Sequence, residues 1–435
     1  MVQAHEDQHR SPPYDSVMTI RLIEPSFWQQ PLDDRMREMI AIRESGPFVE
    51  VPFHNELTDT DERFFAVTRY DDVVAISKNA KDFSSAQGAI SIVDLPPEAL
   101  EFFGSFINMD NPRHQRQRAI VAKTFTPTDL ASVLDSVETI VSEVIDGFCE
   151  QGEVDLVEAL SQPFPLLVIC DMMGIPRSEF KTVLDATNVI LGGGDPEFVG
   201  DGDPMTAILT AGLQLTELMN ELSDARRKNP TDDLTSKLVH ADVDGEMLAP
   251  EEVAPFFILL AVAGNDTTRT AISHGMNLLA QHPEQRATWQ GDVEGVTATA
   301  VEEIVRYASP VTFMRRTLTR NLTMSGHDLV EGDKVVLLYG AANRDPHAFD
   351  APETFDVRRN PNPHLGFGGP GPHFCLGANL ARRELAVVFR QLFERLPDIE
   401  VVGDAVPLEV AGLPLVGGIK RLPVRFTPTV PSSNG

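Results

Sequence analysis

The stretch HLGFGGPGPHFCLGANLARRE, residues His364 to Glu384, says more about the fold than any other part of this sequence. Four glycines and two prolines fall in the eleven residues before Cys375, and a helix-like run follows it. Free backbone N–H groups and the dipole at a helix start favour negative charge, which suits a cysteine thiolate. Such a thiolate attacks a substrate or binds a metal, and small glycines let the backbone lie close against a large, flat group.

The loop and the cysteines each allow a second interpretation, which we consider weaker for the loop and for Cys375. Gly366 to Gly371 matches G-x-G-x-x-G letter for letter, as in the nucleotide-binding loop of a nicotinamide dehydrogenase. However, PNPH rather than a strand precedes it, and the helix begins only after the cysteine. A buried, inert thiol is the usual fate of a free cysteine. We expect that fate for Cys149 and for Cys170 within LLVIC, and not for Cys375.

The composition is that of a globular chain with a strong acidic excess. It has 435 residues, a hydrophobic fraction of 42% and a formal net charge of −29 at pH 7. That charge disfavours nucleic acid or an anionic membrane surface as a partner. Three cysteines argue against a disulfide framework and fit a reducing cytoplasm, where we expect the protein. The absence of a C-x-x-C argues against a zinc ribbon or covalently attached haem. No apolar run predicts a signal peptide or a transmembrane anchor.

Apolar residues at three- and four-residue spacing predict a mostly helical protein. Helices are expected at 31–44, 70–78, 126–150, 154–173, 205–229, 250–281, 283–290, 297–307 and 376–396, and short strands at 49–53, 63–67, 334–338 and 423–426. Asp244 and Gly245 predict a tight turn. Strands flank a helical middle and no linker divides the chain, so we predict one large domain over 19–428, mainly α with small β-sheets. A disordered tail is expected at 1–18 and a second tail at 429–435.

The cysteine loop resembles the haem-binding loop of the cytochrome P-450 superfamily, in which an invariant cysteine is the axial thiolate ligand of haem iron. The family pattern runs Phe, two residues, Gly, one residue, Arg or His, one residue, Cys, one residue, Gly. Its matches here are Gly371, His373, Cys375 and Gly377, and Phe367 lies one place further from the cysteine than the pattern asks. The shifted F-G-G-x-G form, which contains Gly369, is similar to a bacterial subgroup that oxidises steroid side chains and methyl-branched lipids. The resemblance implies non-covalent haem b and the single large P-450 fold.

Segments far from the cysteine resemble further motifs of this family. Glu303 and Arg306, three apart on a predicted helix, match its E-x-x-R pair. A later arginine completes this structural triad: Arg359 fits by spacing, and Arg358 is the alternative. The residues that the family pattern places against haem propionates are His114, Arg118, Arg316 and His373. Cationic side chains suit a carboxylate, although an exposed basic surface is the plainer interpretation of each.

AGNDTT, residues 263–268, falls in the middle of the predicted 250–281 helix. Threonine, aspartate and asparagine lower helix propensity, and buried polar groups need partners. The segment therefore either faces another helix or breaks this one and holds water and protons. It resembles the acid–alcohol motif of the family. The resemblance makes Asp266 and Thr267 the catalytic residues that deliver protons during oxygen activation, and Gly264 the residue that leaves room for the oxygen.

The resemblance implies a monooxygenase, which uses dioxygen and two electrons to put one oxygen atom into an unactivated C–H bond. The expected substrate is a methyl-branched lipid, terpenoid or sterol side chain, hydroxylated at a terminal or near-terminal carbon. A macrolide-type or linear fatty-acid substrate is an alternative, and a non-enzymatic haem-thiolate sensor is an alternative of another class. The pocket is expected to be lined by Ile92, Phe103, Phe106, Leu259, Val262, Ala263, Val311, Phe313 and Leu415, although core packing explains each singly. Long loops at 84–110 and 192–204 are the expected lids.

Electrons must come from another protein, because no flavin or iron–sulfur motif is visible in the sequence. Residues 111–128 contain four basic side chains and no acid, and two arginines follow the cysteine: Arg113, Arg116, Arg118, Lys123, Arg382 and Arg383. Our hypothesis is a basic docking surface for an acidic ferredoxin, which a ferredoxin reductase would reduce. A solvated helix face is the alternative.

Overall fold

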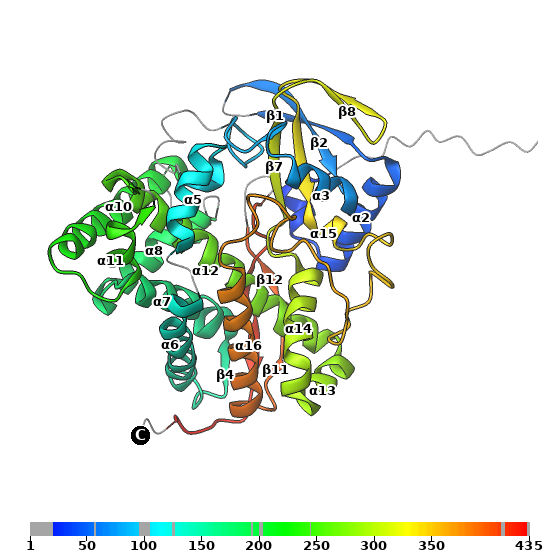
Figure 1. The fold of residues 1–435 in the computed structure, drawn as a ribbon. Coiled ribbons are helices and arrows are strands. Elements are labelled where there is room, and N and C mark those ends of the chain that lie inside the picture. Colours follow the sequence, from blue (N-terminus) through cyan, green and yellow to red (C-terminus); the bar gives the residue numbers. More distant parts are fainter. Residues whose placement is uncertain are drawn as a thin grey trace, which may run out of the picture.

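The structure, a computed structural model, describes residues 21–55, 58–94, 105–123, 127–192, 195–199, 203–243, 245–409 and 414–432. Figure 1 shows helices over most of the molecule and strands gathered mainly on one side, which confirms the prediction of a mainly α fold with small β-sheets. The expected tail at 1–18 lies outside the described residues. Within the expected C-terminal tail, the Thr429 N–H donates to the Cys149 carbonyl at 2.9 Å.

The helices are α1 (Pro25–Trp28), α2 (Leu32–Ser45), α3 (Tyr70–Lys78), α5 (Arg113–Lys123), α6 (Pro127–Asp146), α7 (Pro163–Met173), α8 (Phe180–Leu191), α9 (Pro196–Val199), α10 (Pro204–Lys228), α11 (Leu234–His240), α12 (Pro250–Gln281), α13 (Pro283–Gly291), α14 (Val293–Ala308), α15 (Tyr339–Ala342) and α16 (Ala378–Arg395). Short helical turns are η1 (Phe106–Asn108), η2 (Val157–Ser161) and η3 (Arg177–Glu179). No described helix combines the length and the apolar content needed to cross a membrane.

The strands are β1 (Val49–Asn55), β2 (Thr60–Val67), β3 (Phe83–Ser84), β4 (Glu153–Asp155), β5 (Asp242–Val243), β6 (Glu246–Met247), β7 (Phe313–Leu318), β8 (Leu322–Met324), β9 (His327–Leu329), β10 (Lys334–Leu338), β11 (Glu400–Val401), β12 (Val406–Pro407), β13 (Ile419–Arg421) and β14 (Pro423–Arg425). The largest sheet has the order β1-β2-β10-β7-β3, in which only the β2–β10 pair is parallel. A second sheet has the order β11-β14-β4. Asp244 of the predicted turn lies outside the described residues, and β5 and β6 pair on either side of it.

Apolar periodicity located the long helices well. The prediction of 70–78 matches α3 and that of 250–281 matches α12, end to end. Helix α12 starts at Pro250, where a missing backbone N–H costs nothing. A carboxylate oxygen of Glu252 accepts a hydrogen bond from the Ala249 N–H at 2.7 Å, which satisfies one free donor at this helix start.

The prediction of one helix over 154–173 is wrong. Residues 153–155 form strand β4, which pairs with β14, and a π-type turn at 157–161 precedes α7. The sequence contains the reason, because Pro163 cannot donate the N–H that a continuous helix requires at that point. A pairing partner more than 260 residues away decides the strand, and no local pattern reveals it.

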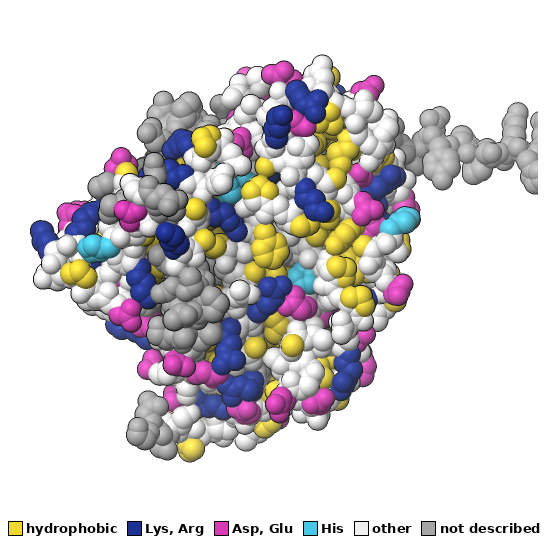
Figure 2. All heavy atoms as spheres, viewed as in Figure 1, with side chains coloured by type: hydrophobic (Ala, Val, Ile, Leu, Met, Phe, Trp, Pro, Cys, Tyr) yellow, Lys and Arg dark blue, Asp and Glu magenta, His cyan; other side chains and the backbone are white. Residues whose placement is uncertain are grey.

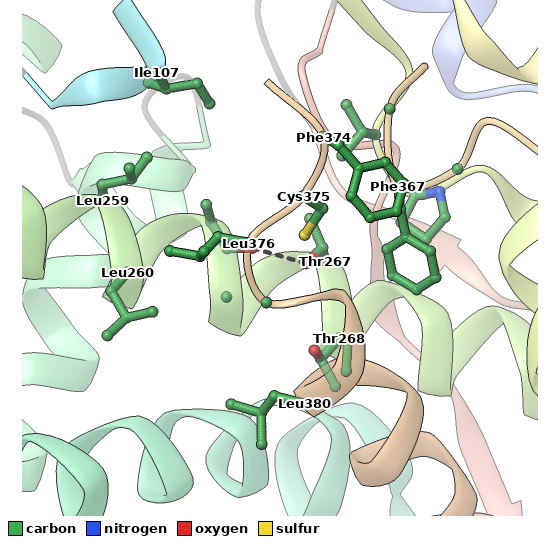
Figure 3. A pocket seen from close by; sticks show the side chains of 18 of the residues that line it. Ile107, Leu259, Leu260, Thr267, Thr268, Phe367, Phe374, Cys375, Leu376 and Leu380 are labelled. Atoms are coloured by element: carbon green, nitrogen blue, oxygen red, sulfur yellow. Dashed lines mark hydrogen bonds between the residues drawn. The ribbon is translucent and has the colours of Figure 1, made fainter. Parts of the chain in front are cut away.

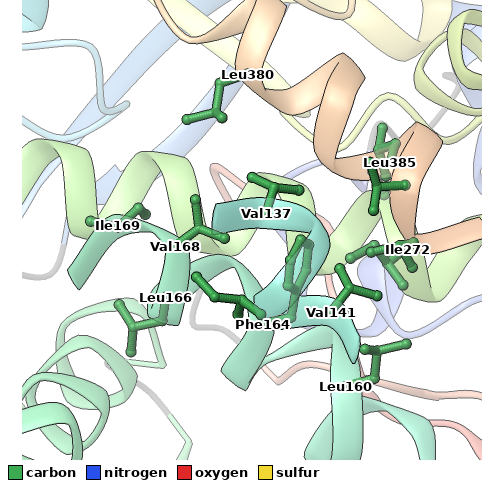
Figure 4. Packing of buried hydrophobic residues seen from close by; sticks show 14 of the residues in the cluster. Val137, Val141, Leu160, Phe164, Leu166, Val168, Ile169, Ile272, Leu380 and Leu385 are labelled. Atoms are coloured by element: carbon green, nitrogen blue, oxygen red, sulfur yellow. The ribbon is translucent and has the colours of Figure 1, made fainter. Parts of the chain in front are cut away.

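Helices α6, α7, α12 and α16 share one apolar core. Figure 4 shows Val137 and Val141 of α6 with Phe164 of α7, Ile272 of α12 and Leu385 of α16. All five are almost completely buried. Burial of such a side chain contributes about 1.5–3 kcal/mol, so this cluster fixes α12 against the start of α16, where the cysteine loop ends.

A buried ion-pair cluster ties α14 to the chain that leads into the cysteine loop. Arg306 donates to both carboxylate oxygens of Glu303, at 2.7 and 2.8 Å, and both side chains are fully buried. Arg359 adds contacts to the same carboxylate at 3.1 and 3.2 Å, whereas Arg358 lies 3.8 Å from Asp292 instead. Arg306 also donates to the Asn343 carbonyl at 2.9 Å, and Asn343 accepts from the Leu365 N–H at 2.7 Å, directly ahead of the loop.

Candidate active site

A cavity lies between the middle of α12 and the cysteine loop. Figure 3 shows Leu259 and Leu260 of α12, Leu380 of α16 and Ile107 facing the same space as Cys375. The apolar side chains that line it are Phe106, Ile107, Ile169, Phe256, Leu259, Leu260, Ala263, Ala271, Val305, Val311, Met314, Phe367, Phe374, Leu376, Leu380, Ala381 and Leu385. Polar groups enter the lining mainly at two places, the Thr267–Thr268 turn and an edge that carries Arg118, Arg316 and His373.

The sulfur of Cys375 is open to this cavity and held from behind by backbone. The Cys375 N–H donates to the Phe367 carbonyl at 2.9 Å, and the Gly377 N–H donates to the sulfur. Burial among protein atoms raises the pKa of the thiol, and the Gly377 N–H and the Arg118 charge lower it. An N–H donor and nearby cations stabilise a thiolate, and a bound metal removes the thiol proton outright.

Two glycines of the loop, Gly369 and Gly377, have different surroundings. A Cβ at Gly369 would lie 2.4 Å from the Ser77 hydroxyl, so this residue lets the loop pack against α3 and does not line the cavity. Gly369 is thus not among the residues that line the cavity, and its contact with the cofactor stays a prediction. Gly377 does line the cavity, and a Cβ there would meet no described atom within 4 Å.

The acid–alcohol segment sits in an unbroken helix. Residues 263–268 are α-helical within α12, so the alternative of a broken helix is wrong. The Thr267 hydroxyl donates to the Ala263 carbonyl one turn back at 2.7 Å, which keeps the helix intact and the side chain at the cavity (Figure 3). Gly264 also lines the cavity, where a Cβ would come within 3.1 Å of Ile169 on α7.

Asp266 and Asn265 lie behind the cavity wall. Both side chains are buried, and Asp266 Oδ1 and both amide atoms of Asn265 have no hydrogen-bond partner among the described residues. Burial raises the pKa of Asp266, and the Arg269 guanidinium, 3.6 Å from Oδ1, lowers it. Buried polar groups of this kind are normally satisfied by ordered water, so this part of α12 suits water and proton movement.

Sequence analysis missed one acid of this site, Glu384. It lies on α16, lines the cavity and accepts a hydrogen bond from the Thr268 hydroxyl at 3.0 Å. Complete burial raises the pKa of its carboxyl to about 8, and the Thr268 hydroxyl lowers it. The charged run ARRE gave no reason to separate this residue from a solvated helix face. The one indication of Glu384 in the sequence was its position, two turns into the helix that follows Cys375.

A basic cluster occupies one edge of the cavity. His114 and His373 lie ring to ring with centroids 4.2 Å apart, and His373 lines the cavity while His114 lies behind it. Burial and the Arg118 guanidinium lower the pKa of His114 to about 4. Arg118 donates to the Phe374 carbonyl at 2.5 Å and lies over the Phe106 ring. Neither Arg118 nor Arg316 forms an ion pair with a carboxylate of the described residues, although the charge of Asp110 acts on Arg316 and His114 from a greater distance.

Four of the nine predicted pocket residues line the cavity: Phe106, Leu259, Ala263 and Val311. Val262 lies on another face of α12, because helix positions 259, 263 and 267 face one way. Phe313 and Ile92 pack into the sheet-side core instead, since successive side chains of β7 point to opposite faces and Met314 faces the cavity. Leu415 is 36% exposed and does not line the cavity, and Phe103 lies outside the described residues.

The side chains of the cavity fit haem. The cavity has an open sulfur at its floor, a glycine surface beside it and apolar walls, which suits a large, flat, apolar ring. The basic edge supplies charge for two carboxylates, and the buried Nε2 of His114 has no partner among the described residues. Cys375 would hold the iron, and Arg118, Arg316, His373 and His114 would hold the propionates.

Comparison with known proteins agrees with this site. A family model described as Cytochrome P450 matches residues 213–397. A methyl-branched lipid omega-hydroxylase of Mycobacterium tuberculosis is 45% identical over 427 residues, which cover 96% of each chain. The chain belongs to the cytochrome P450 family. A steroid C26-monooxygenase of Rhodococcus jostii is 36% identical over 90% of this chain and 81% of its own.

A solved structure also shows the same fold. A Mycobacterium marinum cytochrome P450 in complex with pseudoionone aligns with a TM-score of 0.86 and 37% identity, over 96% of this chain and all of that one. The protein is therefore a P450 oxidoreductase, a monooxygenase with a haem-thiolate iron centre. The sensor and dehydrogenase interpretations are set aside. A dinucleotide-binding loop would need a strand directly before Gly366. Residues 339–399, all of which the structure describes, contain no strand.

We predict that Cys375→Ala abolishes the red-shifted Soret band of the reduced, carbon monoxide-treated protein, because that band requires a thiolate ligand. The matched control is Cys149→Ala, which removes a buried thiol far from the cavity and should keep the band. An absorption spectrum at equal haem content measures both. A normal band in Cys375→Ala would contradict the assignment of the ligand.

Proposed function

We propose that this P450 hydroxylates a methyl-branched lipid, terpenoid or sterol side chain at a terminal or near-terminal carbon, with dioxygen and electrons from a ferredoxin system. The observation that carries the proposal is the apolar lining above Cys375, formed by Leu259, Leu260, Val311 and Met314 without a charged side chain among them. An apolar chain end gains free energy by entering such a cavity. The printed activities of the relatives, on methyl-branched lipids and steroids, support the same class.

The chain's own residues position the substrate and supply protons. Haem b, when bound through Cys375, supplies the redox chemistry that inserts oxygen into a C–H bond. The Thr267 hydroxyl faces the cavity beside Thr268, and in this proposal it is the group that passes protons to the reaction. Asp266 would reload Thr267 through water in the buried polar part of α12, where burial raises the pKa of its carboxyl and favours the protonated form.

The apolar walls have a second task, the exclusion of bulk water. Phe106, Phe256 and Leu376 are part of the apolar lining. In this proposal they limit bulk water near the reacting carbon, so that protons come from the polar groups of α12. Ordered proton supply matters because protons that arrive without control divert oxygen to peroxide. The protein thus contributes a mainly apolar cavity whose polar side chains are concentrated around the Thr267–Thr268 turn and at the basic edge.

We predict that a terminally branched fatty acid binds more tightly than its linear isomer, because the extra methyl group fills the apolar space near Cys375. The probes are 14-methylpentadecanoic acid and pentadecanoic acid, which differ by the branch methyl group alone, with the linear isomer hexadecanoic acid as a second control. Their titration of the ferric protein is measured as a shift of the Soret band to shorter wavelength. One added buried methyl group is worth about 0.8 kcal/mol, or about fourfold in affinity over pentadecanoic acid. Tighter binding of hexadecanoic acid than of the branched acid would favour the alternative of a linear fatty-acid hydroxylase.

We predict that Thr267→Ala uncouples electron use from product formation, since it removes the hydroxyl at the cavity wall. The ratio of product to consumed reductant should fall by about a hundredfold or more, the usual contribution of a general acid, while hydrogen peroxide rises. Thr267→Ser is the control, because it keeps the hydroxyl and should keep most of the coupling. Unchanged coupling in Thr267→Ala would count against the proton-donor role.

The proposed docking surface for the ferredoxin surrounds the loop at Phe374, a side chain that is 39% exposed. Figure 2 shows Lys and Arg side chains over the region of α5 and α16, with acidic side chains among them. Acids of this chain pair with several of these bases: Arg116 with Glu252, Arg382 with Glu302 and Arg383 with Glu138. Arg113 is exposed and has no ion pair with a described carboxylate, so it is the most available charge for an acidic partner.

We predict that Arg113→Glu slows reduction by a ferredoxin severalfold at low salt, and that about 0.5 M salt removes the difference through screening. The control is Arg425→Glu on β14. The β14 sheet lies beyond the far end of α16, about 27 Å along a helix of 18 residues. Stopped-flow absorption with carbon monoxide measures the reduction rate. Equal rates for Arg113→Glu and the unmodified protein at low salt would exclude this surface.

A further inference from the structure

The phenylalanine of the cysteine loop is displaced along the sequence, yet it still lies next to the cysteine. Phe367 is one place further from Cys375 than the cytochrome P450 pattern asks. Its carbonyl nevertheless accepts the Cys375 N–H at 2.9 Å, and its side chain lines the same cavity (Figure 3). The loop therefore accommodates one extra residue while its phenylalanine keeps its contact with the cysteine.

Arg382 of α16 lies over this ring. Its guanidinium carbon is 4.4 Å from the centre of the Phe367 ring, which is within the range of a cation–π interaction. Burial raises the pKa of the Cys375 thiol, and the Gly377 N–H lowers it. The positive charges of Arg118 and Arg382 lower it further. One guanidinium thus contacts the ring and also stabilises negative charge at the sulfur.

A carboxylate on α14 fixes the position of this guanidinium. Arg382 donates to the two carboxylate oxygens of Glu302 through two nitrogens, at 2.5 and 3.0 Å. Such a fork restricts the plane of the guanidinium as well as its distance. Burial raises the pKa of Glu302, but hydrogen bonds from His364 and Arg382 outweigh this effect and lower the pKa to about 2. The carboxylate is therefore charged at neutral pH and holds the arginine.

His364 joins this pair to the cysteine loop itself. Its Nδ1 accepts the Gly366 N–H at 3.1 Å, so the ring is neutral and has its proton on Nε2. That nitrogen lies 2.8 Å from a carboxylate oxygen of Glu302. The His364 side chain is only 2% exposed, and its ring centre lies 5.7 Å from that of Phe367. The histidine and the phenylalanine belong to one short segment, so the network and the ring move together.

The neighbouring arginine has the same charge and different contacts. Arg383 pairs with Glu138 of α6 at 3.2 Å, and its side chain is 47% exposed. Within the part of the chain that the structure describes, it makes no hydrogen bond or ring contact with the cysteine loop. The two arginines of α16 therefore form a matched pair in which only Arg382 contacts the loop.

We propose that Arg382, held over the Phe367 ring, raises the reduction potential of haem bound through Cys375. Glu302 and His364 act through Arg382 as positioning residues. A fixed positive charge near the ligand favours the reduced iron, which has one positive charge less. Partners of a metal ligand tune the metal in this way even though they do not bind it. The inference requires haem at this site but not the proposed substrate class.

Reductive titration of the haem-containing full chain without substrate, followed by absorption, measures the potential. Arg382→Met should make the potential more negative, because it removes the positive charge over the ring. Arg383→Met makes the same change in net charge on the same helix. Its shift should be smaller by at least about threefold, because Arg383 does not contact the loop and water screens an exposed charge. Equal shifts in the two variants would overturn the role of Arg382.

A second substitution tests the positioning role without a change of charge. His364→Leu removes a neutral ring, yet it should also make the potential more negative, because Glu302 and Arg382 lose their link to the loop. His364→Gln is its control, since the glutamine amide can donate to the same carboxylate and should keep the potential. The Arg382→Met, His364→Leu double variant should show no more than the Arg382→Met shift. An unchanged potential in His364→Leu, or additive shifts in the double variant, would overturn the positioning role.

The red-shifted Soret band of the reduced, carbon monoxide-treated protein shows which variants keep the thiolate ligand. Should Arg382→Met lose this band, Arg382→Lys takes its place, because it keeps the charge but neither the fork nor the planar contact with the ring. Its potential should again be more negative than that of the unmodified protein. An unchanged potential in Arg382→Lys would overturn the role of the contact with Phe367.

Discussion

The fully buried carboxylate of Glu303 is the interaction on which the position of the cysteine depends. Two arginines from separate segments, Arg306 and Arg359, donate to it, and the backbone N–H of Asp356 adds a bond at 2.8 Å. A buried charge is tolerable only when it is paired and hydrogen-bonded, so these groups must stay together. The chain from Asn343 to Leu365 forms no strand or helix after α15, so this cluster fixes its path. That path sets the position of the loop that contains Cys375.

A second constraint is the contrast between apolar walls and a few buried polar groups. Most of the cavity is carbon, and the polar side chains in or behind it are concentrated on α12 and at the basic edge. Burial of each polar side chain without a partner costs free energy of folding. Burial raises the pKa of Asp266, whose Oδ1 has no hydrogen-bond partner among the described residues, and raises the pKa of Glu384 to about 8. Both carboxyl groups therefore lower the stability of the fold at neutral pH. Groups that lower stability in this way commonly mark functional sites, and here Glu384 lines the cavity that contains Cys375 while Asp266 lies behind its wall.

The basic surface around the cysteine loop has less unpaired positive charge than the sequence suggests. The sequence offers an acid-free window at 111–128, but folding brings Glu252 to Arg116, Glu302 to Arg382 and Glu138 to Arg383. These ion pairs within the molecule neutralise much of the positive charge that the sequence seemed to offer to a partner. What is left for a partner is smaller and more local, centred on Arg113 and the exposed ring of Phe374. Charge counted along a sequence therefore overstates the field that a partner meets.

Local patterns in the sequence determined most of the long helices and located the cysteine loop and the acid–alcohol segment. Helical periodicity fixes α3 and α12 because one apolar face repeats every 3.6 residues, and the order of glycines and prolines around Cys375 defines the loop before any neighbour is known. The tertiary structure alone decided what depends on distant partners. It made residues 153–155 a strand, chose Arg359 over Arg358, turned Gly369 towards Ser77 and buried Glu384 beside Thr268. The physical reason is that burial and charge pairing are set by the groups that fold against a residue, and those groups lie tens to hundreds of residues away.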